Sequence, residues 1–263
     1  MAFLFQVYFL NMLMCCVLSL VWGGYSLGIK GWINLCKQYW FVTAYVILYI
    51  LTPILNTFID RANKKQIKSF LCVFFCVQTI IGFVCHSDFA DGYSALSFIG
   101  LYILARYMHL YPIEYTQLNK YVYLAIYFVA TIVTTAIALL LVVSGGNAWR
   151  VFSYCSPFVI LASVCLLLFF SKISIRSKIV NWIVVSCFAA YVVHCSPIFF
   201  STYLETIKRW FDNEGTLVFL LYTTLWIVSV FAVSILFDKI RILVWNLIAT
   251  LFAKLKENKY FLQ

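Results

Sequence analysis

The feature that most constrains this chain is an uncharged apolar run, residues 40–59, followed at once by a basic cluster. A helix of about 20 residues crosses a bilayer core of about 30 Å. Arg61, Lys64, Lys65 and Lys68 follow the run in a short loop before the next apolar run. Positive residues so close to a membrane span stay in the cytoplasm. The run and its cluster therefore predict how the rest of the chain is threaded.

The composition is that of a membrane protein. The chain is 65% hydrophobic and 11% charged, with a mean hydropathy of +0.98, whereas ordinary domains are about half apolar and about a quarter charged. No run alternates as a barrel strand does. We therefore predict an all-α integral membrane protein, a polytopic bundle of about eight transmembrane helices. The runs long enough to span are about 2–22, 40–59, 69–85, 94–111, 120–143, 152–171, 179–200 and 216–237.

The loop charges predict that both ends of the chain are cytoplasmic. The even-numbered loops and the tail carry thirteen of the 19 Lys and Arg residues, and the odd-numbered loops carry five. The remaining base, Arg106, lies within a run. Because cytoplasmic loops carry the excess of positive charge, the odd-numbered loops face outward. Some of these outer loops carry carboxylates, among them Asp88, Asp91, Glu205, Asp212 and Glu214, which either bind a sugar or, the interpretation we favour, are simply solvated.

The net charge of +10 predicts topology and not a nucleic-acid partner, because the bases stand in short clusters beside apolar runs. None of the ten cysteines forms a CxxC pair, so no zinc or other metal site and no redox motif is indicated. The absence of GxSxG, Walker A, HExxH and paired-carboxylate motifs gives no support to a standard hydrolase, ATPase or metalloprotease.

The chain after the last run predicts an amphipathic C-terminal helix. Apolar residues recur at helical spacing from Ile240 to Leu255, and bases lie mostly off that stripe. Such a helix lies on the inner leaflet. We therefore predict a transmembrane domain over residues 1–238 and a cytoplasmic amphipathic tail over residues 239–263.

Polar side chains within spans are costly and suggest functional sites. Arg106 lies near the cytoplasmic end of its run, where it either reaches the headgroups or binds an anionic donor. His194 lies near the outer end of the seventh run. Its role is either that of a general base for a hydroxyl or that of a hydrogen-bonded helix histidine. Pro53 interrupts the ladder of the second helix, and Asn56 is placed to satisfy a freed backbone group.

Three stretches together resemble the acyltransferase-3 family of bacterial membrane O-acyltransferases, in particular its polysaccharide-modifying members. The first stretch is Trp40-Phe41, Ala44-Tyr45, Leu48-Tyr49, Pro53 and Asn56. The second is Gly92-Tyr93-Ser94, Leu101-Tyr102 and Ala105-Arg106-Tyr107. The third is Ser156-Pro157-Phe158, Asn181-Trp182 and Tyr191-Val192-Val193-His194. Their order and spacing across residues 40–200 carry the resemblance.

The resemblance implies transfer of an acetyl group from acetyl-CoA to a sugar hydroxyl of a cell-surface polysaccharide or glycolipid, in the bacterial inner membrane. Arg106 would then bind the donor, and His194 would support catalysis. Trp40, Tyr45, Asn56 and Tyr191 become candidates for substrate binding or for structure. The partners implied are the lipid bilayer and a glycan acceptor, and a homo-oligomer is compatible with the sequence.

The resemblance also implies that the chain lacks two N-terminal helices of the family's ten-span bundle. The family's first helix carries the arginine and histidine taken as its catalytic pair, and residues 1–22 supply neither. Whether this chain alone is an enzyme is therefore left open. The alternatives are a transporter or lipid-linked glycan flippase, and a non-catalytic remnant or partner subunit.

Overall fold

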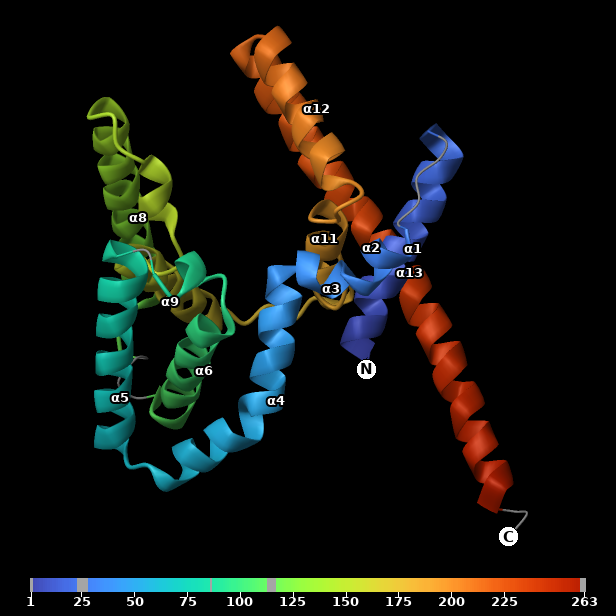
Figure 1. Cartoon of the computed structure of the whole chain (residues 1–263), viewed down its shortest axis with the longest axis horizontal. Helices are drawn as coiled ribbons and strands as arrows, with labels where there is room; N and C mark the ends of the chain where they lie inside the picture. Colours follow the sequence, from blue (N-terminus) through green and yellow to red (C-terminus); the bar gives the residue numbers. More distant parts are fainter. Residues whose placement is uncertain (1, 23–27, 86, 113–116, 261–263) are drawn as a thin grey trace. The chain divides into compact units, whose positions relative to one another are not determined.

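The computed structural model describes residues 2–22, 28–85, 87–112 and 117–260, so the last three residues of the predicted tail lie outside it. Within these ranges all regular secondary structure is helical and no strand forms. The all-helical prediction is confirmed. The chain divides into two compact units, one of residues 39–175 and one of residues 1–38 with 176–263 (Figure 1).

The expected apolar runs are mainly helical, but the helices differ in length, and turns interrupt the runs 152–171 and 179–200. Among the described residues, six helical segments are long and apolar enough to span a membrane: Ala2–Leu20, Trp40–Arg61, Lys64–Val84, Lys120–Val143, Ala148–Ser171 and Thr216–Leu251. Two shorter apolar segments, Ala95–Leu110 and Lys178–His194, account for the other two runs. The chain is thus a multi-pass membrane protein. The count of eight spans and the side on which each end lies stay predictions.

The unit of residues 39–175 contains α4 (Trp40–Arg61), α5 (Lys64–Val77), a π-helical turn (Gln78–Val84), η2 (Ala90–Gly92), α6 (Ala95–Leu110), α8 (Lys120–Val143), η3 (Ala148–Phe152) and α9 (Pro157–Ser171). Helix α6 packs against both α4 and α5, and α8 packs against α9. Gly100 permits the close approach of α5 and α6, because a Cβ there would lie 2.0 Å from the Phe74 ring.

Local sequence explains where these helices begin and why α4 runs on through its proline. Asn63 and Gln66 form a capping box that starts α5 directly after the turn that ends α4. Ser94 caps α6 and Asn119 caps α8. Pro53 lies inside α4 without ending it: it removes one N–H donor from the ladder, and the helix continues to Arg61.

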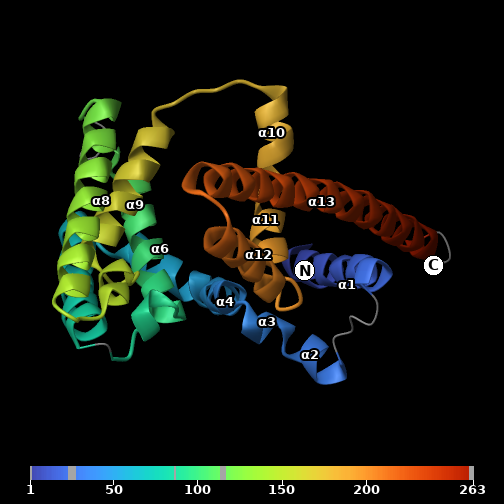
Figure 2. The ribbon, with the colours of Figure 1, turned by 90° about the horizontal axis from the view of Figure 1, so that it is seen from above.

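The unit of residues 1–38 and 176–263 contains α1 (Ala2–Trp22), α2 (Ile29–Ile33), α3 (Leu35–Gln38), α10 (Lys178–Val184), α11 (Cys187–His194), α12 (Phe200–Asn213) and α13 (Thr216–Tyr260). Helix α1 contacts α11 and α13, and α12 lies beside the first part of α13, as Figures 1 and 2 show. The buried side chains here join α1 to the end of α11, through Met14, Leu18, Val193 and Phe199.

Helix α13 differs from the expected span and separate tail. It continues for 45 residues without a break at residue 238, because neither glycine nor proline occurs in it to interrupt the helix. The predicted apolar stripe of the tail is exposed at Ile240, Leu243, Leu247 and Leu251. The domain boundary at residue 238 stays a prediction.

Candidate functional site

The loops around η2 and η3 form a cavity at one end of the 39–175 unit. The backbone N–H of Tyr154 and the hydroxyl of Ser153 both donate to the carbonyl oxygen of Asp91, at 3.0 and 3.3 Å. Asp91 and Gly92 hold positive φ angles of 54° and 91°, which glycine adopts readily and aspartate tolerates better than most residues. The two loops are therefore joined at the Asp91 carbonyl, by one backbone and one side-chain hydrogen bond.

This cavity, which we name the loop cavity, has a volume of about 690 Å³. It is lined by Asp91, Tyr93, Asn147, Trp149, Arg150, Phe152, Ser153 and Tyr154. The Arg150 Nη2 donates to the carbonyl oxygen of Val84 at 2.8 Å, which fixes the guanidinium at the cavity. A carboxylate, an amide, a guanidinium and hydroxyls thus line one hollow together with aromatic rings.

Trp40, the first residue of α4, packs behind the aromatic wall of the loop cavity. Its ring meets Tyr93 edge-on, with centroids 4.6 Å apart and planes at 89°, and lies 5.9 Å from the ring of Tyr154. Burial raises the pKa of Tyr93, and the neighbouring Tyr154 and Asp91 raise it further. The Tyr93 phenol is therefore held neutral, as a hydrogen-bond donor. The sequence singled out Trp40, and the structure gives it this position.

A basic region lies at the other ends of α4 and α6. Helix α6 begins beside Tyr93, and its 16 residues correspond to about 24 Å. At its far end the ring of Tyr111 lies under the Lys64 Nζ, 5.1 Å from the centroid. The basic cluster of the α4–α5 turn is therefore at this end. Arg106 lies on the last turns of α6, and its Nε is buried without a hydrogen-bond partner in the described part of the chain.

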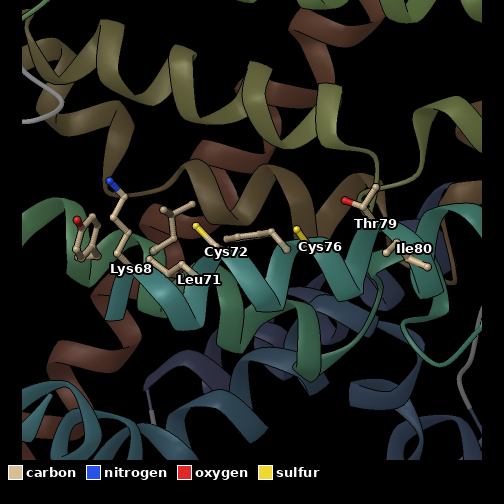
Figure 3. A pocket seen from close by; sticks show the side chains of 9 residues that line it. Lys68, Leu71, Cys72, Cys76, Thr79 and Ile80 are labelled. Atoms are coloured by element: carbon tan, nitrogen blue, oxygen red, sulfur yellow. The ribbon is translucent and has the colours of Figure 1, made fainter. Parts of the chain in front are cut away.

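An apolar groove runs along α5 from this basic end (Figure 3). Its volume is about 570 Å³. Lys68, Cys72 and Cys76 follow one another along the helix in the labelled view, with Thr79 and Ile80 beyond them, and Leu104 and Tyr107 of α6 complete the lining. Its lining is mainly apolar, with Lys68, Thr79 and Tyr107 as the polar side chains, so it resembles a lipid-facing furrow more than a reaction site.

The remaining candidates on α4 have structural partners. The hydroxyl of Tyr102 donates to Asn56 Oδ1 at 2.6 Å, so Asn56 joins α4 to α6. The partner shown for its side-chain oxygen is thus Tyr102, and not the backbone near Pro53. Tyr45 is exposed and its ring is nearly parallel to that of Phe41, at 6.3 Å. Asn56 thus contributes to packing, and Tyr45 is available at the surface.

His194 and Tyr191 belong to the other unit, at the end of α11. The His194 Nδ1 lies 2.7 Å from the carbonyl oxygen of Ala190, and its Nε2 lies 3.2 Å from the Sγ of Cys195. The rings of Tyr191 and Tyr203 lie 6.1 and 6.0 Å from the imidazole. The hydrogen bond expected for a helix histidine is present, and the second nitrogen faces a thiol.

A buried polar cluster in the same unit escaped prediction. Asp238 is fully buried and accepts from Arg241 Nε at 2.6 Å and from Gln6 Nε2 at 2.8 Å. Farther along α1, Asn11 Oδ1 accepts from the Ser196 hydroxyl at 2.8 Å. Gln6 and Asn11 are polar residues in the apolar run 2–22, and this is the signal that could have located the cluster.

Within the described ranges, no three His, Cys, Asp or Glu side chains come together in a group able to hold a metal ion. For a cofactor or donor, the groups of suitable chemistry are Arg106 and the basic cluster, because both carry positive charge at one end of the 39–175 unit. The loop cavity is a polar hollow of that unit that a neutral ligand could enter.

Comparison with known proteins identifies the family. A family model described as an acyltransferase domain, acyltransferase-3, matches residues 2–239. Neither a curated protein nor a solved structure matches the chain. The match covers all three motif stretches from which the resemblance was argued, and it extends over most of the helices of both units. The chain therefore belongs to the acyltransferase-3 family of membrane acyltransferases.

Proposed function

We propose that this protein transfers an acetyl group from acetyl-CoA to a sugar hydroxyl of a cell-surface glycan, in the bacterial inner membrane. Family membership supports membrane acyl transfer. The observation that carries the acceptor assignment is the loop cavity, in which aromatic rings and a few polar groups line a hollow of about 690 Å³. Hollows of this size and mixed lining are typical of small-molecule sites.

The lining of the loop cavity suits a sugar. A pyranose presents hydroxyls around its edge and an apolar face of C–H groups. Trp149, which is 84% exposed, and the ring of Tyr154 offer flat surfaces for that face. Asp91 accepts hydrogen bonds and Arg150 donates them. The neutral phenol of Tyr93 both donates and accepts, so an uncharged polyol finds partners of either kind.

The positive charge at the basic end of α6 supports binding of the acyl donor there. CoA carries phosphates, and an arginine binds phosphate with charge-assisted hydrogen bonds. Arg106 has a buried Nε without a partner in the described part of the chain, and leaving such a group unsatisfied is costly. An anionic ligand at this end of α6 would satisfy it, and Lys64, whose Nζ lies over the Tyr111 ring at the same end, would add to the field.

The loop cavity and the basic region lie at opposite ends of α4 and α6, about 24 Å apart along α6. This spacing is close to the thickness of a bilayer core, about 30 Å. Following the charge asymmetry of the loops, the basic end would face the cytoplasm, where acetyl-CoA is made, and the loop cavity would face outward. An acceptor glycan and an anionic donor would thus approach from opposite sides.

The experiment is a CoA-release assay on the full chain in lipid nanodiscs, with acetyl-CoA and methyl glycosides of hexoses and N-acetylhexosamines. We expect glycoside-dependent release of CoA and an acetylated glycoside by mass spectrometry. Trp40→Ala should raise the KM for glycoside several-fold, whereas Tyr49→Ala, an exposed residue of the same helix, should not.

Release of CoA that no glycoside stimulates would contradict a sugar acceptor. Transport of a lipid-linked glycan without any CoA release would favour the flippase alternative. Activity that appears only on addition of a longer family member would identify the chain as a partner subunit.

A further inference from the structure

The strongest unassigned chemistry in the described chain is the contact between two neighbouring side chains, His194 and Cys195, at the end of α11. We propose that Cys195 is a nucleophile activated by His194 and carries the acyl group as a thioester. The proposal deepens the proposed function, on which it rests for the identity of donor and acceptor. Its chemical core can be tested without either of them.

The hydrogen bonds of His194 define which nitrogen is basic. A carbonyl oxygen only accepts, so the contact of 2.7 Å with Ala190 requires the hydrogen on Nδ1. The Nε2 of the neutral ring then carries a lone pair, and it faces Cys195 Sγ at 3.2 Å. A nucleophile, a base within hydrogen-bond reach, and a third group that orients the base are the three parts of an activated nucleophile.

The backbone around the pair is held firmly. The backbone N–H of Cys195 donates to the carbonyl oxygen of Tyr191 at 3.1 Å. The next residue, Ser196, is fully buried and bonds Asn11 of α1 at 2.8 Å. A fixed backbone on both sides of Sγ limits the rotamers that the thiol can adopt, and fixed geometry is what an activated nucleophile needs.

A small apolar cavity adjoins this end of α11. Its volume is about 170 Å³, and Met14, Leu18, Val193, Phe199 and Trp226 are among the residues that line it. A dry apolar cavity of about 150 Å³ holds a molecule the size of benzene. Tyr203 bridges the cavity and the pair, because its ring contacts His194 at 6.0 Å and Trp226 at 6.2 Å. A short acyl chain would fit here.

The acyl transfer then has two balanced halves. Nε2 of His194 takes the Sγ hydrogen of Cys195, the thiolate attacks the carbonyl carbon of acyl-CoA, and the bond from that carbon to the CoA sulfur breaks. The CoA thiolate leaves with the proton from the imidazolium. In the second half the acceptor hydroxyl gives its hydrogen to Nε2, its oxygen attacks the carbonyl carbon of the Cys195 thioester, and the bond from that carbon to Sγ breaks. The Cys195 thiolate then takes the proton back from the His194 imidazolium. No oxidant or reductant is needed.

A half-buried thiol is mostly neutral at pH 7, so fast attack by Cys195 requires His194 as the base. The probe is S-phenyl thioacetate, a small uncharged thioester that does not depend on a CoA site. The full chain in nanodiscs is treated at pH 7.5, and acetylation of each cysteine is followed by peptide mass spectrometry.

We expect Cys195 to be acetylated at least ten-fold faster than Cys187, an exposed cysteine of the same helix. His194→Asn should slow Cys195 at least ten-fold, since a general base contributes about 10²–10⁴-fold, and should leave Cys187 unchanged. Asparagine retains a donor near the Nδ1 position for the carbonyl of Ala190, so the helix end is kept, and circular dichroism checks the fold.

Equal rates for Cys195 and Cys187 in the wild type, or no slowing by His194→Asn, would overturn the activated thiol. A second arm uses labelled acetyl-CoA without acceptor. Label on Cys195 that is lost in Cys195→Ser supports the carrier role. If Cys195→Ala acetylates glycoside at the full rate, the carrier role is overturned while the acyltransferase proposal stands. If S-phenyl thioacetate labels Cys195 but acetyl-CoA does not, the activation of Cys195 by His194 is supported and acetyl-CoA as the donor to Cys195 is contradicted.

Discussion

Gly92 and Tyr154 approach so closely that a Cβ on Gly92 would lie 2.4 Å from the Cβ of Tyr154. Gly92 also has a φ of +91°, where side chains are strained. The backbone hydrogen bond from Tyr154 to Asp91 lies directly beside this contact. The glycine therefore lets the η2 loop dock on the segment after η3, and this docking shapes the loop cavity.

Gly92→Ala should separate the two loops. We expect a loss of stability of about 1–3 kcal/mol from backbone strain alone, with the clash adding to it, and a large rise in the KM for glycoside. Thermal unfolding in detergent and the CoA-release assay measure the two effects. Gly145→Ala is the matched control, because Gly145 has a φ of +75° but nothing within 4 Å of its Cβ position. Equal effects of the two variants would refute a role for the contact with Tyr154.

Tyr102→Phe should weaken the contact between α4 and α6. It removes the 2.6 Å hydrogen bond to Asn56 and leaves the amide oxygen half-buried, so we expect a loss of about 0.5–1.5 kcal/mol. Thermal unfolding measures it against Tyr121→Phe, an exposed tyrosine of α8. A double variant with Asn56→Ala should lose little beyond either single one. Additive losses would show that the two side chains do not interact.

Tyr93 should ionise above the ordinary pKa of 10.0, because burial and its neighbours Tyr154 and Asp91 raise its pKa. The folded state then keeps a proton that the unfolded state releases, so this contribution to stability is present below pH 10 and is lost as pH rises further. The difference in phenolate absorbance between wild type and Tyr93→Phe isolates this residue. A difference spectrum that titrates at or below pH 10.0 would contradict the described environment.

The helices could be predicted from sequence because each depends on a local property. Uncharged runs of spanning length gave the positions of α1, α4, α8 and the first part of α13, and caps such as Asn63 lie where the apolar periodicity begins. Trp40 could be singled out because it belongs to a motif that the chain shares with the acyltransferase-3 family. Its contacts with Tyr93 and Tyr154 could not, since they depend on how distant loops fold back on the start of α4.

The polar contacts that join distant helices were hidden for the same reason. Gln6 bonds Asp238 across 232 positions of the chain, and no local spacing relates them. Charge counting placed Arg241 in the cytoplasmic amphipathic tail, off its apolar stripe, whereas the structure buries it with Asp238. Cys195 was passed over because a cysteine in an apolar run is most often a small hydrophobe, and only its distance from His194 distinguishes it.

The buried Asp238–Arg241 pair provides the final prediction. Asp238→Asn keeps an acceptor for Gln6 but leaves the guanidinium of Arg241, whose side chain is only 10% exposed, without its counter-charge. Removing one partner of a buried pair costs about 3–5 kcal/mol, so we expect a large fall in the unfolding temperature, measured in detergent.

The double variant Asp238→Leu with Arg241→Met should recover much of this loss, because apolar side chains of similar volume often replace a buried pair with little cost. Lys239→Met is the matched control, because it removes a positive charge from the same turn of α13. The Lys239 Nζ donates to the carbonyl oxygen of Trp182 in an exposed hydrogen bond. If the double variant were as unstable as Asp238→Asn, the pair would do more than neutralise charge, and the hydrogen bond from Gln6 to Asp238 would be what holds α1 against α13.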